Sequence, residues 1–160
     1  MTMEQDDKEL KRAKNTAYRF LTIRPRSRYE VEQKLRDREF PPDIITTVID
    51  HLLRLGYLDD QKFAVQWAAS RVRTRGFGRR RIEQELRTRG IVRELIDETL
   101  LGLFEEASEL DVAVREAEKK LRTLGRFEPE VRKRRLAGHL ERKGFPAEII
   151  WKILGDIRKS

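Results

Sequence analysis

The sequence predicts an all-α protein whose three tandem three-helix repeats form an elongated, curved, solenoid-like body. Apolar residues recur with the 3.6-residue period of a helix, and no segment alternates with the period of a strand. The chain also resembles itself at offsets of about 50 residues, which is typical of stacked helical units. With 38% hydrophobic and 40% charged residues, the composition favours several small cores over one large core.

The repeat is clearest in three five-residue segments that align with one another. They are Val31–Leu35 (VEQKL), Ile82–Leu86 (IEQEL) and Leu136–Leu140 (LAGHL), at offsets of 51 and 54 residues. At the same distance downstream of each segment lies an apolar pair: Ile44-Ile45, Leu95-Ile96 and Ile149-Ile150. Agreement in two separate segments is hard to obtain by chance. We therefore expect the repeats at residues 1–56, 57–107 and 108–160.

Capping signals place the helices of the first repeat, which we expect at residues 7–23, 28–38 and 42–55. Ser27 with Glu30 forms a capping box at the start of the second helix. Pro42 suits the first turn of the third helix, because its missing N–H costs nothing there. Gly56 provides the left-handed closing residue of the repeat.

The other two repeats have the same punctuation, and their helices are expected at residues 60–75, 79–89, 92–106, 109–124, 129–143 and 146–158. The Asp59-Asp60 pair caps the first of these helices. Gly78 precedes Ile82 by four residues, as Ser27 precedes Val31, so Gly78 is the expected N-cap of the helix 79–89. Three glycines lie just past expected helix ends, where a left-handed residue closes a helix: Gly90, Gly125 and Gly144. Pro146 begins the last helix. Two tryptophans on apolar faces are expected in the core, Trp67 and Trp151.

Most of the net charge of +8 lies in one segment. Six arginines and no acid occupy residues 71–81, namely Arg71, Arg73, Arg75, Arg79, Arg80 and Arg81. A solvated helix face usually mixes both signs, so this segment indicates the footprint of an anionic partner, either phosphate or an acidic protein surface. The alternative is a solvated basic loop with no partner.

Arginines also fill the first three positions of the helix 79–89, where the helix dipole favours Asp or Glu. The first repeat follows this rule, with Glu30 in the corresponding turn. We therefore predict that an anion from outside the chain binds at this helix start, where it meets the arginines and the free backbone N–H groups. Phe77 is expected to pack on Ile82 as a hydrophobic staple rather than to stack on a base.

A second basic run lies in the helix 129–143. It adds three candidate partner contacts: Arg132, Lys133 and Arg135. Acidic residues dilute this run, so an ordinary solvated helix face is an equal alternative. Arg87 and Arg89 are interpreted as structural, because Glu83 and Glu85 lie four residues before them on the same helix face.

The inventory of reactive side chains argues against an enzyme. The chain has no cysteine, and His51 and His139 have no paired ligand at metal-binding spacing. The Gly76–Gly78 segment lacks both the dinucleotide-binding and the P-loop patterns. We expect no catalytic residue, no metal and no cofactor. Without cysteine, targeting segment or membrane-spanning run, we expect a cytoplasmic protein.

Several short motifs follow one another through the central repeat. They are Gly56–Asp60 (GYLDD), Phe63-Ala64, Trp67, Arg75–Gly78 (RGFG), Ile82–Leu86 and Arg89–Ile91 (RGI). In this order and spacing they resemble the RecX family, regulators of the bacterial RecA recombinase. The resemblance covers nearly the whole chain. The third repeat departs from it at Gly138-His139, where the second repeat has Gln84-Glu85.

The resemblance implies a protein that binds RecA and its filament on single-stranded DNA. Such a protein lies in the helical groove of the filament and limits ATP hydrolysis, filament growth and strand exchange, and so regulates recombination, DNA repair and the SOS response. Some family members also contact DNA. The residues alone leave two alternatives: a general DNA-binding helical repeat protein that acts through phosphate contacts, and a structural adaptor for an unknown acidic partner.

Overall fold

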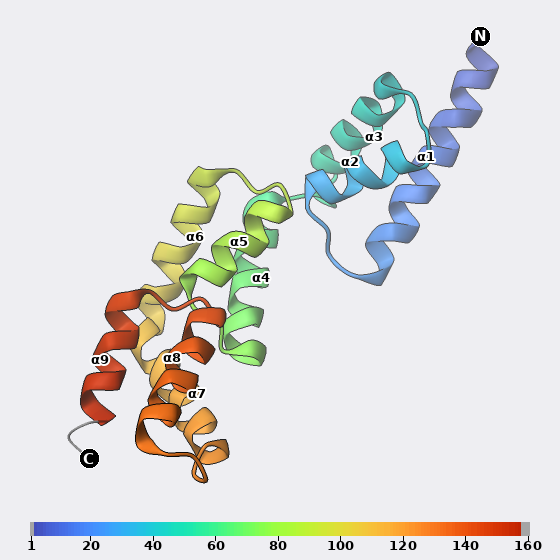
Figure 1. Ribbon diagram of the computed structural model, residues 1–160. Helices are drawn as coiled ribbons and strands as arrows, with labels where there is room; N and C mark the ends of the chain where they lie inside the picture. Colours follow the sequence, from blue (N-terminus) through green and yellow to red (C-terminus); the bar gives the residue numbers. More distant parts are fainter. Residues whose placement is uncertain (1, 158–160) are drawn as a thin grey trace.

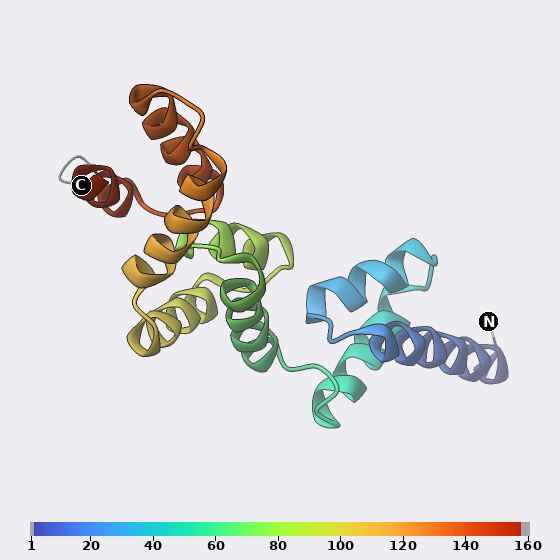
Figure 2. The same ribbon diagram turned by 90° about the horizontal axis from the view of Figure 1, so that it is seen from below.

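The computed structural model describes residues 2–157, and within this range the chain forms nine helices and no strand. The helices are α1 (Met3–Ile23), α2 (Arg28–Asp37), α3 (Pro42–Arg54), α4 (Asp60–Arg75), α5 (Arg79–Thr88), α6 (Arg93–Glu106), α7 (Glu109–Thr123), α8 (Pro129–Arg142) and α9 (Ala147–Ile157). Figures 1 and 2 show them as three successive groups along an elongated body, with the two ends of the chain far apart. The predicted all-α repeat fold is confirmed.

Each group of three helices encloses its own hydrophobic core. The first core joins α1 to α3, the second α4 to α6 and the third α7 to α9. We call these groups the first, second and third units. The residues that anchored the sequence alignment are all fully buried: Val31, Leu35, Ile82, Leu86, Leu136 and Leu140. The self-similarity of the sequence therefore reports the centre of each three-helix bundle.

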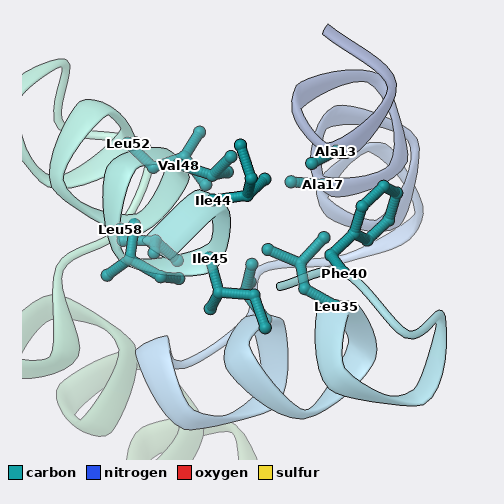
Figure 3. Packing of buried hydrophobic residues seen from close by; sticks show 11 residues of the cluster. Ala13, Ala17, Leu35, Phe40, Ile44, Ile45, Val48, Leu52 and Leu58 are labelled. Atoms are coloured by element: carbon teal, nitrogen blue, oxygen red, sulfur yellow. The ribbon is translucent and has the colours of Figure 1, made fainter. Parts of the chain in front are cut away.

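The first unit shows how small side chains permit close packing of its helices (Figure 3). Ala13 and Ala17 of α1 are fully buried, and Ile44 of α3 points towards them. Leu35 at the end of α2 and Phe40 just beyond it fill the space next to α1. Burying one such large aliphatic or aromatic side chain contributes about 1.5–3 kcal/mol, so this core supplies the main favourable free energy for folding of the unit.

The helix ends follow the local signals in the sequence. Ser27 and Glu30 form the reciprocal capping box on α2, and Asp59 caps α4 by accepting the Lys62 N–H. The eight helix starts from α2 onward and their ends agree with the expected ranges to within one residue over the described chain. Residue 158, expected at the end of α9, lies outside the described residues.

Three expectations about single elements are wrong. Helix α1 begins at Met3 rather than at residue 7: the Thr2 carbonyl accepts its first backbone hydrogen bonds, and Glu4 and Asp6 favour the first turn. Gly125 does not adopt a left-handed backbone; Gly76 does, at φ 62°. Trp151 is 75% exposed on α9, whereas Trp67 is half-buried against the second core.

Candidate partner-binding surface

The basic segment 71–81 lies where the second unit meets the third. Helix α4 ends at Gly76 in the left-handed conformation, and the chain turns through Phe77 to Gly78, the N-cap of α5. Phe77 packs against the core that contains Ile82, as expected of a hydrophobic staple. The positive φ of Gly76 favours glycine, and a Cβ there would also overlap the side chain of Glu116 in α7.

The start of α5 is closed by the third unit. The Gly78 N–H donates to the Lys143 carbonyl at 2.8 Å, and the Arg80 N–H donates to the Gly144 carbonyl at 3.0 Å. The buried carboxylate of Glu109 accepts from the Arg79 backbone N–H at 2.9 Å and from the Arg79 Nε at 2.7 Å. The negative charge that the helix dipole favours therefore comes from α7.

This arrangement overturns the prediction of an external anion at the start of α5. The sequence showed a helix whose first turn lacks an acid, and the acid lies in the next unit, 30 residues away in the chain. The N–H groups of Gly78, Arg79 and Arg80, which would bind an anion, already have acceptors within the protein. Helices α5 and α8 instead meet head to tail, so that the carbonyls of Lys143 and Gly144, just beyond the end of α8, accept from the first N–H groups of α5.

The junction of the first and second units repeats this design. The Ser27 hydroxyl donates to the Arg89 carbonyl at 2.6 Å, and the Arg28 N–H donates to Asp60 at 2.8 Å. Helix α2 therefore meets the end of α5 as α5 meets the end of α8. The carboxylate at each junction comes from the first turn of the next unit. This recurrence identifies Glu109 as the carboxylate of the second junction. It can be recognised only in the folded chain, where the units lie next to one another.

Arg71 belongs to an aromatic cluster of the second unit rather than to a free basic surface. Its Nε pairs with Glu85 at 3.0 Å, and its guanidinium lies 4.3 Å from the Trp67 ring centre. Glu85 also accepts the Trp67 indole N–H. The expected pairing of Arg89 with the Glu85 carboxylate is wrong: Arg89 donates to the Glu85 carbonyl and stacks at 3.8 Å on Trp67. Arg87 does pair with Glu83, at 2.7 Å.

Burial lowers the pKa of Arg89, whose Nε has no hydrogen-bond partner among the described residues. Three guanidinium groups thus lie over one indole, since Arg24 of the first unit also approaches Trp67. This cluster joins the first unit to the second. The cluster cannot be recognised from the sequence alone, because its members come from three separate segments.

Four arginines of the basic segment remain available to a partner. They are exposed and make no ion pair with any described residue: Arg73, Arg75, Arg80 and Arg81. Arg81 lies over the Phe77 ring at 5.0 Å, where Lys143 lies at 5.5 Å, so the unit junction gathers positive charge around this aromatic side chain. Arg79 is excluded from this group, because Glu109 neutralises it.

The second basic run is not continuous with the first. Arg132, Lys133 and Arg135 lie near the start of α8, whereas the basic segment meets the end of that helix at Lys143 and Gly144. Ten residues of helix separate Lys133 from Lys143, or roughly 15 Å at the usual rise. Arg132 and Lys133 line a cavity of about 470 Å³ between α7, α8 and α9, and Arg135 stacks on Phe127.

The histidines occupy ordinary structural positions. His51 lies 2.7 Å from the Tyr18 hydroxyl, and burial lowers its pKa, as do nearby Lys14 and Arg54. Burial likewise lowers the pKa of His139, with Lys120 and Lys143 acting in the same direction. Among the described residues, no group of three metal-binding side chains lies together, and no helix has the length and apolarity to cross a membrane.

Comparison with known proteins accounts for the three units. Models of the first, second and third three-helix domains of RecX match residues 13–52, 59–100 and 107–154 in that order. A regulatory protein RecX from Mycolicibacterium smegmatis is 36% identical over 145 residues, covering 89% of this chain and 77% of that protein. One from Thermobifida fusca is 34% identical, covering 91% and 78%.

The chain belongs to the RecX family of regulatory proteins.

Solved RecX structures agree with this assignment at the level of the fold. The crystal structure of RecX from Lactobacillus salivarius matches with a TM-score of 0.82 at 24% identity, over 96% of this chain and 99% of that one. A second RecX crystal structure matches with a TM-score of 0.81 at 21% identity, over 95% and 74%. The three-unit body is therefore the RecX fold, and this family consists of regulatory proteins rather than known enzymes.

Proposed function

We propose that this protein binds RecA and its filament on single-stranded DNA and inhibits RecA ATP hydrolysis, filament growth and strand exchange. The observation that supports this most directly is the match to all three RecX domains in their native order. The elongated body suits a partner with a long groove (Figure 1). Its site of action is the cytoplasm, in recombination, DNA repair and the SOS response.

The contact surface that we propose centres on the exposed arginines at the junction of the second and third units. Arg73, Arg75, Arg80 and Arg81 carry charge that no described carboxylate neutralises. Unpaired positive charge of this density attracts an anionic surface and accelerates encounter with it. Arg132, Lys133 and Arg135 extend the contact along the third unit, while Arg71 and Arg79 hold the surface in place.

A double substitution of Arg80 and Arg81 tests this surface. Removing two unpaired cations from a contact with an anionic partner weakens binding, and we expect the affinity for the RecA filament to fall by about tenfold or more. The measurement is co-sedimentation of the Arg80→Ala, Arg81→Ala protein with RecA filaments on single-stranded DNA.

The matched control replaces two exposed lysines of the first unit, Lys8→Ala with Lys11→Ala, which removes the same charge. Circular dichroism checks that helical content is unchanged in both proteins. Unaltered binding of the Arg80, Arg81 variant would remove this surface from the proposal.

A second candidate function is general DNA binding through phosphate contacts, favoured by the same unpaired arginines. Such binding needs no RecA and weakens steeply as salt displaces the released counterions. Titration of the protein onto bare single-stranded and double-stranded DNA at two salt concentrations tests it. Equal affinity at both concentrations would rule out this function.

A further inference from the structure

A hollow in the first unit combines apolar side chains with cations that form no ion pair with any described residue. It lies between α1 and α2, has a volume of about 210 Å³, and is lined by Thr16, Arg19, Phe20, Ile23, Lys34 and Arg38. None of its lining residues is acidic. This face is separate from the basic segment 71–81 and from the second basic run in α8, and it belongs to the first unit.

The charges around this hollow are not neutralised within the protein. Arg19, Lys34 and Arg38 form no ion pair with any described residue, and neither does Arg12 one turn before Thr16. The nearby carboxylate of Glu30 is already engaged by Arg24 and Arg26. Asp37 lines the adjoining hollow with Lys34 but does not pair with it. These four cations can therefore attract an anionic surface of a partner.

The apolar part of the hollow is also exposed to solvent. Ile23, the last residue of α1, is 77% exposed, although it lines the hollow together with Phe20. A cavity of about 150 Å³ is enough for a benzene-sized group, so this one has room for a single leucine, isoleucine or phenylalanine side chain. Drug-sized ligands need about 300 Å³ or more, which argues against a small-molecule site.

The details favour an acidic protein segment over a nucleic acid. The Phe20 ring is covered by the Arg26 guanidinium at 3.8 Å from its centre and approached by Lys34 at 5.3 Å, which hinders the stacking of a base. The one hydroxyl of the hollow, on Thr16, already donates to the Arg12 carbonyl. No uncharged hydrogen-bond donor of the hollow is therefore left to read the edge of a base.

We infer that the α1–α2 face of the first unit is a docking surface for an acidic protein segment that inserts one aliphatic or aromatic side chain into this hollow. Arg12, Arg19, Lys34 and Arg38 receive the carboxylates, and Phe20 and Ile23 contact the inserted side chain. The inference deepens the proposed function, on which it rests: it gives the protein a second contact with its partner, at the opposite end of the body from the third unit (Figure 1).

The experiment uses the whole protein and a panel of fluorescent acidic 15-residue peptides, each with leucine, isoleucine or phenylalanine at its centre. The same peptides with serine at the centre, and a single-stranded dT oligonucleotide, serve as competing probes. We expect peptides with an apolar centre to bind at least about tenfold more tightly than the serine peptides, since that side chain becomes buried.

Two variants locate the binding. Ile23→Ser and the pair Arg19→Glu, Arg38→Glu change exposed side chains and should each weaken peptide binding about tenfold or more. The pair Lys11→Glu, Arg36→Glu makes the same charge change on other faces of α1 and α2 and should leave binding nearly unchanged.

Three outcomes would overturn the inference: no peptide binding, no preference for the apolar centre, or displacement from this face by the oligonucleotide. The assay contains no RecA. A protein that binds these peptides but has no effect on RecA would contradict the proposed function and leave the docking surface standing.

Discussion

Glu109 positions the start of α5, which carries the exposed Arg80 and Arg81. Its carboxylate is 7% exposed and accepts both the Arg79 backbone N–H and the Arg79 side chain. A helix that begins with three arginines is unfavourable by itself, and this single acid from the next unit offsets the unfavourable charge. The position of Arg80 and Arg81 at the unit junction depends on it.

Replacing Glu109 with alanine leaves the first N–H of α5 and the Arg79 guanidinium without their carboxylate acceptor. We expect the free energy of unfolding to fall by about 1–3 kcal/mol, the usual cost of an orphaned buried polar group. Urea unfolding followed by circular dichroism measures it. Glu118→Ala on the same helix changes an exposed acid and should have little effect; equal losses in the two variants would contradict the role of Glu109.

His139 makes stability depend on pH. Burial lowers its pKa below the ordinary 6.5, and the charges of Lys120 and Lys143 lower it further. The unfolded chain therefore binds this proton more readily than the folded chain, so stability is highest above pH 6.5 and falls as the pH drops through the ordinary histidine range. We expect His139→Gln to reduce the loss of unfolding free energy between pH 7.5 and pH 5.5. The same loss in both proteins would contradict this assignment.

At the scale of the helix, head-to-tail contacts explain why two glycines are required. Gly90 and Gly144 close α5 and α8 with positive φ, at 76° and 95°. Each also faces the start of the preceding unit's middle helix: a Cβ on Gly90 would overlap Tyr29, and one on Gly144 would overlap the backbone nitrogen of Arg81. The glycines therefore serve both the helix end and the junction.

Gly144→Ala combines backbone strain with a clash against main-chain atoms. We expect a loss of about 2–4 kcal/mol, because neither the left-handed backbone nor the Arg81 nitrogen can yield cheaply. Gly102→Ala is the matched control, since that glycine lies within α6 and a Cβ there meets open space. It should be neutral or stabilising by about 0.5–1 kcal/mol. Thermal or urea unfolding of both variants tests the contrast, and a harmless Gly144→Ala would contradict the junction geometry.

The helices could be predicted closely because their signals are local. The Ser27–Glu30 box, Asp59 and Gly78 each lie beside the helix end that they fix. The start of α1 could not, because no apolar residue lies between Met3 and Leu10 to reveal the period. The exposure of Trp151 cannot be predicted for a related reason: the period of α9 identifies its residues as helical, but only packing decides which large side chain faces outward.

The candidate surface could be predicted only in part. The concentration of arginines is plain in the sequence, and four of its six members are exposed and unpaired. Arg71 and Arg79 differ because Glu85 and Glu109 reach them across 14 and 30 residues of chain. Charge counts along a sequence do not show such pairs. The α1–α2 face cannot be recognised in the sequence, because its cations lie on two helices that only the fold brings together.

In the whole molecule, the three units are joined unequally. Val72 packs against both the second and the third cores, and Phe145 lies against Gly78, so apolar contacts cross this junction. The first junction relies on hydrogen bonds and on the cations around Trp67. We propose that residues 1–56, 57–107 and 108–160 act as three repeat units, of which the second and third present one rigid surface to the partner.

The regulatory role of the whole body is tested most directly by RecA ATP hydrolysis on single-stranded DNA. The protein is titrated into the reaction well below the RecA concentration. We predict that hydrolysis falls at these substoichiometric amounts, because one elongated molecule in a filament groove affects many RecA subunits, whereas competition for DNA requires far more protein. Unchanged hydrolysis at every ratio up to equimolar would contradict the proposed regulation of RecA.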